Sequence, residues 1–208
     1  MIIEALPVGP IQANCYVVGC EETREAAVID PGAEADRILQ ALARHRLTVK
    51  LILNTHGHFD HVGANAALKA ATGAELCIHA QDAPMLADLV SAASMFGMRV
   101  DNSPPADRLL QDGDRLAFGN LNLSVIHTPG HTRGGISFAM DGALFVGDTL
   151  FAGSIGRTDF PGGDYDTLIR SIREKLFVLD EQVTVYPGHM GTTTIGREKR
   201  YNPFAGLG

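Results

Sequence analysis

The stretch Thr55-His56-Gly57-His58-Phe59-Asp60-His61 decides how the rest of this 208-residue chain is interpreted. Three of the eight histidines and a carboxylate fall between His56 and His61, a density that hydrophobic packing does not require. Neutral imidazole and carboxylate groups are good ligands for divalent metal ions. The stretch therefore predicts a metal-binding site rather than a simple polar turn.

The motif is expected at a turn between a buried strand and a helix. The apolar run before it is typical of a strand, and residues 62–71 are typical of a helix. In an extended segment, His56 and His58 can point to the same side. Asp60 and His61 can face the same cavity from the start of the helix. The motif thus offers one pair of ligands to each of two metals, and the alternative is that Asp60 only caps the helix.

Three further candidates, His131, Asp148 and His189, each follow an apolar run and have a glycine next to them in the sequence. Glycine lets the backbone turn sharply and approach a ligand closely. Together with the first motif they make seven candidate ligands, namely five imidazoles and two carboxylates. That set is too large for one tetrahedral zinc ion and suits a two-metal site that shares one carboxylate. The other histidines have no motif context and are expected to be structural or surface residues: His45, His79 and His127.

Composition limits the classes of function. Hydrophobic residues make up 45% of the chain, which is enough for a sizeable core. The net charge of −7, without a basic run, argues against nucleic-acid binding. No stretch approaches the ~20 apolar residues of a membrane span, and the N-terminus does not resemble a signal peptide. The three cysteines, Cys15, Cys20 and Cys77, form no C-x-x-C pair, so a reducing cytoplasm is expected.

The hydrophobic pattern predicts two successive sets of strands and helices without a linker. Strands are expected at residues 2–6, 13–18, 26–29, 49–53, 75–78, 115–118, 121–126, 135–140, 143–146 and 183–186, and helices at 33–44, 64–71, 81–89 and 166–179. Residues 91–107 are expected to form a surface loop, with the rim of the active site as the alternative. Residues 191–208 are expected to be a short polar tail.

The H-x-H-x-D-H motif, followed in order by His131, Asp148 and His189, resembles the metallo-β-lactamase superfamily. The resemblance implies a single domain over residues 1–208 of the α/β (α+β) class, folded as a four-layer αββα sandwich with the site at the sheet edges. It also implies how the seven ligands are shared. One metal is held by His56, His58 and His131, the other by Asp60, His61 and His189, and Asp148 bridges the two.

Asp60 is an aspartate, and neither position 131 nor position 148 is a cysteine. In both respects the chain is similar to the glyoxalase II side of the superfamily. The stretch Gly156–Asp164 resembles the small, single-domain bacterial glyoxalase II-like hydrolases. This resemblance implies hydrolysis of S-lactoylglutathione, or of a related hydroxyacyl thioester, in methylglyoxal detoxification. The expected cofactors are two divalent metal ions, zinc first, with iron or manganese as alternatives. The expected partner is the small thioester substrate, and the chain is expected as a monomer or small homo-oligomer.

The two aspartates are the expected catalytic residues. Two cations about 3.5–4 Å apart can share a water whose pKa falls to about 7, so hydroxide is the expected nucleophile. A thiol with a parent pKa of about 8.5 can leave without strong acid help. Asp60 is expected to steer the hydroxide proton, and Asp148 to bridge the metals. Asp30 is either a partner that orients a ligand histidine or a turn residue.

Departures from the family keep other functions open. Full-length glyoxalase II has a helical domain with basic residues for glutathione, and here Ala205 replaces an expected arginine, which predicts broad tolerance for the thiol carrier. Arg157 is the expected substrate-binding residue. Related persulfide dioxygenases, which hold one iron, share part of this stretch and are the main alternative. Gly188-His189-Met190 favours the hydrolase, because the dioxygenases carry Ala-His-Asp there. A non-enzymatic metal-binding module is the third hypothesis.

Overall fold

The computed structural model describes all 208 residues and contains two six-stranded β-sheets. In the first sheet, the strands lie side by side in chain order. They are β1 (Ile2–Val8), β2 (Ala13–Gly19), β3 (Glu25–Ile29), β4 (Thr48–Leu53), β5 (Glu75–His79) and β6 (Arg108–Leu110). The first three strands pair antiparallel and the last four pair parallel, so that β3 to β6 all end at one edge of the sheet.

The second sheet has the order β14-β13-β10-β9-β8-β7. Its strands are β7 (Arg115–Phe118), β8 (Leu121–His127), β9 (Ile136–Met140), β10 (Ala143–Gly147), β13 (Thr184–Pro187) and β14 (Thr193–Thr194). Strands β7 to β10 form an antiparallel meander, and β13 then pairs parallel to β10. A short separate hairpin consists of β11 (Leu150–Phe151) and β12 (Ser154–Ile155).

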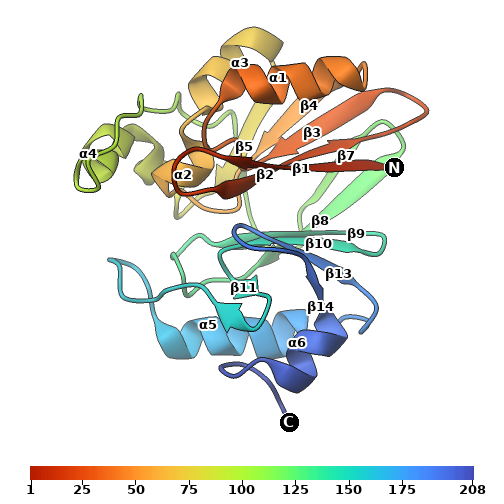
Figure 1. Cartoon of the computed structure of the whole chain (residues 1–208), viewed down its shortest axis with the longest axis vertical. Helices are drawn as coiled ribbons and strands as arrows, with labels where there is room; N and C mark the ends of the chain where they lie inside the picture. Colours follow the sequence, from red (N-terminus) through yellow and green to blue (C-terminus); the bar gives the residue numbers. More distant parts are fainter.

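Helices cover the outer face of each sheet (Figure 1). On the first sheet lie α1 (Ala35–Arg44) and α3 (Asn65–Thr72), and on the second lie α5 (Tyr165–Ser171), its π-helical continuation η2 (Ile172–Leu176) and α6 (Ile195–Tyr201). Three short helical segments, α2 (Phe59–Val62), the 3₁₀ turn η1 (Ala83–Ala87) and α4 (Leu89–Ser94), belong to the first half of the chain. No helix has the length and apolar character that a membrane span requires.

Alternate residues of the central strands enter different hydrophobic cores, and this alternation produces the layers. In β2, Val17 packs in the core beneath α1 and α3, whereas Val18 packs in the core between the two sheets. In β10, Phe145 enters the core between the sheets, and Leu144 and Val146 enter the core under α5 and α6. Each fully buried side chain of this kind stabilises the fold by roughly 1.5–3 kcal/mol. The predicted four-layer αββα sandwich is therefore confirmed.

Several predicted boundaries are wrong. The helix predicted at residues 81–89 is a 3₁₀ turn over Ala83–Ala87 that is followed by α4. The polar tail predicted at residues 191–208 contains β14 and α6. Thr194 caps α6 by accepting a hydrogen bond from the Arg197 N–H, and the buried Ile195 anchors this helix to the third core. The short strands β6, β11 and β12 were also not predicted.

Candidate metal centre

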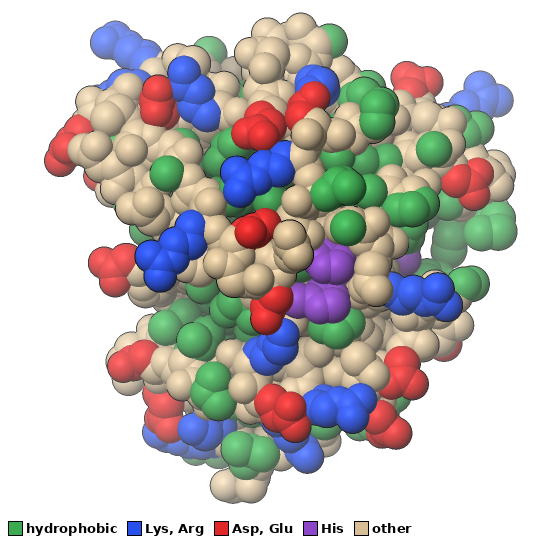
Figure 2. Space-filling model, turned by 180° about the vertical axis from the view of Figure 1, so that it is seen from behind, with side chains coloured by type: hydrophobic (Ala, Val, Ile, Leu, Met, Phe, Trp, Pro, Cys, Tyr) green, Lys and Arg blue, Asp and Glu red, His purple; other side chains and the backbone are tan.

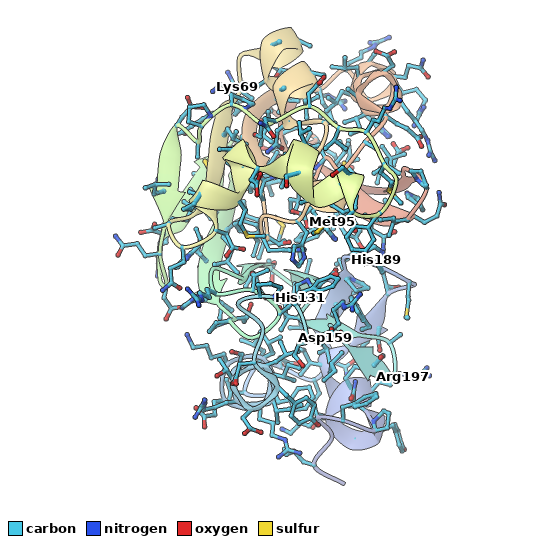
Figure 3. All side chains as sticks on the ribbon, turned by 90° about the vertical axis from the view of Figure 1, so that its left-hand side faces the viewer. Lys69, Met95, His131, Asp159, His189 and Arg197 are labelled. Atoms are coloured by element: carbon cyan, nitrogen blue, oxygen red, sulfur yellow. The ribbon has the colours of Figure 1, made fainter.

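All seven predicted ligands meet at one edge of the two sheets, where strands end. His56 and His58 follow β4, and Asp60 and His61 lie in α2. The remaining three come from the second half of the chain, after β8 (His131), β10 (Asp148) and β13 (His189). Figure 3 labels His131 and His189 at the boundary between the two halves. Figure 2, seen from behind, shows that histidine side chains also reach the surface at the level of this boundary on the opposite face.

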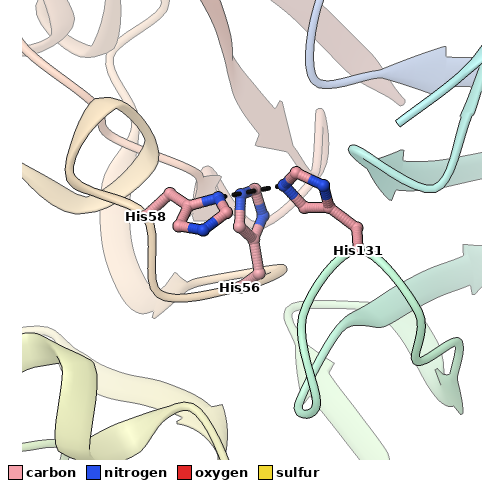
Figure 4. A group of neighbouring side chains, drawn as sticks. All are labelled: His56, His58 and His131. Carbon is pink, nitrogen blue, oxygen red and sulfur yellow. Dashed lines mark hydrogen bonds between the residues drawn. The ribbon is translucent and has the colours of Figure 1, made fainter. Parts of the chain in front are cut away.

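The first group of ligands consists of His56, His58 and His131. One nitrogen from each ring lies within 4.8 Å of the others. The nearest approach is 2.9 Å, between His131 Nε2 and His58 Nδ1 (Figure 4). The three rings come from two different sheets and point toward one position, which is the arrangement that three protein ligands need around a catalytic metal.

The second group consists of Asp60, His61 and His189. Its ligand atoms also lie within 4.8 Å of one another. His61 Nε2 is 3.3 Å from His189 Nε2, and Asp60 Oδ2 is 3.5 Å from the first of these nitrogens and 3.4 Å from the second. Asp60 makes no capping hydrogen bond to α2, so the capping alternative is wrong.

Asp148 lies between the two groups. Its Oδ1 is 3.4 Å from His61 Nε2, and its Oδ2 is 3.6 Å from both His131 Nε2 and His189 Nε2. Gly188 makes this approach possible, because a Cβ at that position would lie 2.2 Å from Asp148 Oδ1 and 2.7 Å from His61 Cε1. A single carboxylate can therefore serve both groups.

The donor atoms of this site fit divalent cations. His56 Nε2 and Asp148 Oδ1 are buried side-chain atoms without any hydrogen-bond partner. Buried polar atoms are almost always paired, and an unpaired one costs about 1–3 kcal/mol. A cation between these atoms would supply the missing partner. We conclude that the His/Asp clusters suit divalent metal ions.

Groups behind the ligands orient the rings. The Asp30 carboxylate accepts from the Thr55 N–H at 2.7 Å and from the Thr55 hydroxyl at 2.6 Å, and its Oδ2 lies 3.1 Å from His61 Nδ1. Thr55 Oγ1 in turn lies 3.0 Å from His56 Nδ1. His131 Nδ1 donates to the Arg157 carbonyl at 2.7 Å. In each case the other ring nitrogen, Nε2, stays free for a metal.

Asp30 combines the two roles that the sequence left open. Its backbone φ of 51° turns the chain at the end of β3. Its carboxylate orients His61 at the same time. The residue is 2% exposed, and its oxygens are occupied by Thr55 and His61, so it is an orienting partner rather than a spare surface acid.

The two ligand groups differ in protonation. Burial and the neighbouring imidazoles lower the pKa of His58 to about 4 and hold the pKa of His56 well below its usual range. Burial also acts to lower the pKa of His61, but Asp148 and the other nearby carboxylates outweigh it and raise this pKa to about 10. Burial opposes ionisation of Asp60, yet the adjacent imidazoles, with His61 first, hold the pKa of this carboxyl well below its usual range.

Aromatic side chains form one side of the site. The Phe160 ring lies 5.9 Å from the His58 ring, and Phe96, which follows α4, lies 6.1 Å from Phe160 and 5.6 Å from Phe59. Residues 91–94 belong to α4, and most of residues 95–107 are exposed and irregular, as the surface-loop prediction states. The contacts of Phe96 agree with the rim alternative. The roles of Phe96 and Phe160 were not predicted individually, because two isolated phenylalanines carry no recognisable pattern.

The predicted substrate residue Arg157 lies on this rim. Its guanidinium donates to both Asp159 oxygens at 2.7 Å and stacks over the Phe160 ring. The side chain is half exposed, but its donors are already partly occupied. Ala205, where an arginine was expected, is fully buried in the third core and does not face solvent.

The other histidines do not join the centre. His79 and His127 stack on each other with ring centroids 4.3 Å apart, and His45 pairs with Glu4. None of the three belongs to a group of metal-ligating side chains, in agreement with their predicted structural or surface role.

Comparisons with known proteins identify the family. The model of the metallo-β-lactamase superfamily matches residues 8–189. The chain is 44% identical to the hydroxyacylglutathione hydrolase GloC of Haemophilus influenzae over 208 residues, and the match covers 98% of each protein.

Solved structures agree with this result. The chain is similar to the B3 metallo-β-lactamase BLEG-1, with a TM-score of 0.92 and 39% identity over 98% of this chain and 99% of the other. It is similar to TTHA1623 in a di-iron-bound form, with a TM-score of 0.89 and 38% identity over 97% of this chain and 99% of the other. It is also similar to ETHE1 from Myxococcus xanthus, with a TM-score of 0.85 and 34% identity over 99% of this chain and 85% of the other. The chain is therefore a hydrolase that belongs to the metallo-β-lactamase superfamily.

Proposed function

We propose that this protein is a dinuclear metal-dependent thioester hydrolase of the glyoxalase II type, with residues 1–208 acting as one domain. The observation that carries the proposal is the position of the Asp148 carboxylate, whose two oxygens lie within 3.6 Å of ligand nitrogens from both groups. The name of the Haemophilus influenzae relative supports the reaction, and the di-iron form of TTHA1623 supports two metals.

In this proposal, His56, His58 and His131 hold one cation, and Asp60, His61 and His189 hold the other, with Asp148 shared. Zinc is the proposed metal, and iron and manganese remain alternatives because nitrogen and carboxylate ligands suit all three. When bound, two such cations supply Lewis acidity and lower the pKa of a coordinated water to about 7.

The side chains of the protein perform the remaining tasks. Asp60 is 17% exposed and stays ionised, so it can accept a hydrogen bond from water at the site and orient that water. Phe160 and Phe96 offer apolar surface beside His58 on which the substrate can rest. Arg157 lies at the outer end of this surface, near the expected position of the thiol carrier. Thiolate leaving groups need no strong general acid, which agrees with the lack of a separate one.

The main alternative is a mononuclear iron persulfide dioxygenase, and the similarity to ETHE1 fits it. The similarity to BLEG-1 makes a β-lactam a necessary control substrate.

Metal analysis combined with three assays tests the proposal. The purified protein is expected to contain two metal ions per chain and to hydrolyse S-lactoylglutathione, with little turnover of a β-lactam. One iron per chain, together with oxygen consumption on glutathione persulfide, would establish the dioxygenase instead.

A further inference from the structure

A second buried carboxylate, Asp82, lies behind the first ligand group. Asp82 sits between β5 and η1, is 1% exposed and has no cationic side chain paired with it. A buried carboxylate without a cation requires several hydrogen-bond donors to remain stable. The donors that bind Asp82 therefore show which segments of the chain this carboxylate holds in place.

All three side-chain contacts of Asp82 go to loops that carry metal ligands. Its Oδ2 accepts from the Gly57 N–H at 3.1 Å and from the Thr132 hydroxyl at 2.7 Å. Its Oδ1 accepts from the Gly134 N–H at 2.7 Å. Gly57 stands between His56 and His58, and Thr132 directly follows His131.

These contacts join the two halves of the molecule at the site. The loop of Gly57 follows a strand of the first sheet, whereas the loop of Thr132 and Gly134 connects two strands of the second. The approach is close, because a Cβ on Gly134 would lie 2.7 Å from Asp82 Oδ1. Asp82 thus links the two loops that carry His58 and His131, whose atoms Nδ1 and Nε2 lie 2.9 Å apart.

Asp30 provides an internal reference for this role. It also accepts a backbone N–H of the histidine-rich stretch, that of Thr55, but its ring contact is with His61 of the second group. The stretch is therefore held by two buried carboxylates. Asp30 contacts the ring of His61 in the second group directly and that of His56 only through Thr55, whereas Asp82 holds the loops of the first group.

We propose that Asp82 is a positioning residue that holds His56, His58 and His131 in the geometry of a metal site. The proposal rests on the dinuclear centre proposed above, and it assigns Asp82 to the first metal alone. Groups that orient ligands typically change metal affinity by about 10–100-fold when they are removed.

The test compares Asp82→Asn with Asp30→Asn in a competition between zinc-loaded protein and a chelator, with the metal content measured at each step. Asparagine keeps the size of the side chain but turns an N–H group toward donors that need an acceptor. For Asp82→Asn we expect one of the two zinc ions to be released at an about 10–100-fold lower chelator concentration, while the other is unchanged.

A coupled variant identifies which ion is affected. In the His58→Ala background the first group is already broken, so Asp82→Asn should change the affinity of the remaining zinc less than about twofold, whereas Asp30→Asn should still weaken it. Asp107→Asn is the control for loss of a carboxylate away from the site, because Asp107 accepts the Leu76 N–H, pairs with Lys69 and contacts no ligand loop. Thr132→Val provides a second, milder variant in case Asp82→Asn does not fold.

The outcomes separate this proposal from the proposed function. Equal zinc affinities in wild type and Asp82→Asn, with only the unfolding midpoint lowered as in Asp107→Asn, would show that Asp82 is merely structural. Weakening of both ions alike would also overturn the assignment. If the wild type bound a single zinc, the dinuclear function would fail, and an about 10–100-fold effect of Asp82→Asn on that ion would still support the role of Asp82.

Discussion

The two ligand groups lie on either side of Asp148, yet they differ in charge. The first contains three imidazoles; burial and the neighbouring rings lower the pKa of His58 to about 4 and hold the pKa of His56 well below its usual range. The second contains a carboxylate, Asp60, and lies against Asp148 and Asp30, which raise the pKa of His61 to about 10. The ring of His58 is thus neutral and can bind a metal directly, whereas the ring of His61 must first lose a proton.

This difference shows that the neighbours of each histidine, rather than the residue type, decide the protonation and hydrogen bonding of its ring before a metal binds. Around His56 and His58 the protein leaves a buried nitrogen without a partner. Around His61 the carboxylates of Asp30, Asp60 and Asp148 lie within 3.5 Å of the ring nitrogens and raise the pKa of the ring.

The largest effect is expected from Asp148→Ala compared with His58→Ala. Both should lower kcat/KM for a thioester by more than about 100-fold, because the loss of a ligand exceeds the loss of an orienting group. Asp148→Ala should lose or weaken both metals, whereas His58→Ala should retain one. Asp148 directly follows β10 and His58 precedes α2 as its N-cap, so neither side chain belongs to a hydrophobic core and the core should survive. Near-wild-type turnover in either variant would show that the residue is not a ligand.

A glycine tests how tightly the shared carboxylate is placed. Gly188→Ala should lower activity by about 10–100-fold, because its Cβ would displace Asp148 Oδ1 and the His61 ring. The matched control is Gly191→Ala, where a new Cβ meets no atom within 4 Å and φ is not positive. Steady-state kinetics and unfolding midpoints distinguish the two variants. Equal activity in both would mean that the packing at Gly188 is dispensable.

The pH dependence of metal binding should separate the two groups. Below pH 10 the metal-free protein holds a proton on His61, so binding at the second group must release it, and affinity should rise up to about tenfold per pH unit between about pH 7 and 9. His58 is already neutral above pH 4, so its ring adds no such dependence at the first group.

The raised pKa of His61 also makes the stability of the metal-free protein depend on pH. In the metal-free protein, the contribution of charged His61 is complete below its usual pKa of 6.5 and is lost as the pH rises through 10.

Zinc titrations of metal-free protein at several pH values, with proton release recorded, measure this effect. Two binding steps with the same pH slope would contradict the difference between the groups.

The smallest effect is expected at the rim. Arg157→Ala should raise KM for S-lactoylglutathione less than about tenfold, because Asp159 already occupies the guanidinium. The backbone carbonyl of Arg157, which orients His131 in the first group, survives the substitution. Asp159→Asn should free the guanidinium and lower KM for glutathione thioesters more than for a thioester without carboxylates. A loss of metal in Arg157→Ala would show that the side chain also supports the first group.

Local patterns were sufficient for much of the fold and for the candidate ligands. The seven residues could be selected because ligand chemistry and strand-end positions are visible within short stretches, such as His56 to His61. The apolar runs of β2 and β10 likewise predicted strands, and the structure shows that both strands are buried on both faces.

Other features depend on packing between distant segments. The helix α6 is held by the buried Ile195 and Glu198, although its sequence is mostly charged. Phe96 reaches the rim because α4, the helix before it, packs beside α2, so that its ring lies near Phe59 and Phe160.

The sequence by itself determined which side chains can bind metal and which strands carry them, because both depend on residue type and spacing over a few residues. The family resemblance of the sequence already implied that Asp148 stands between the two groups. The tertiary structure alone decided that Asp82 holds two ligand loops, that Asp30 contacts both Thr55 and His61, and that His58 and His61 have opposite pKa shifts. The physical reason is that hydrogen bonding, burial and Coulomb interaction depend on distances between atoms that lie far apart in the chain.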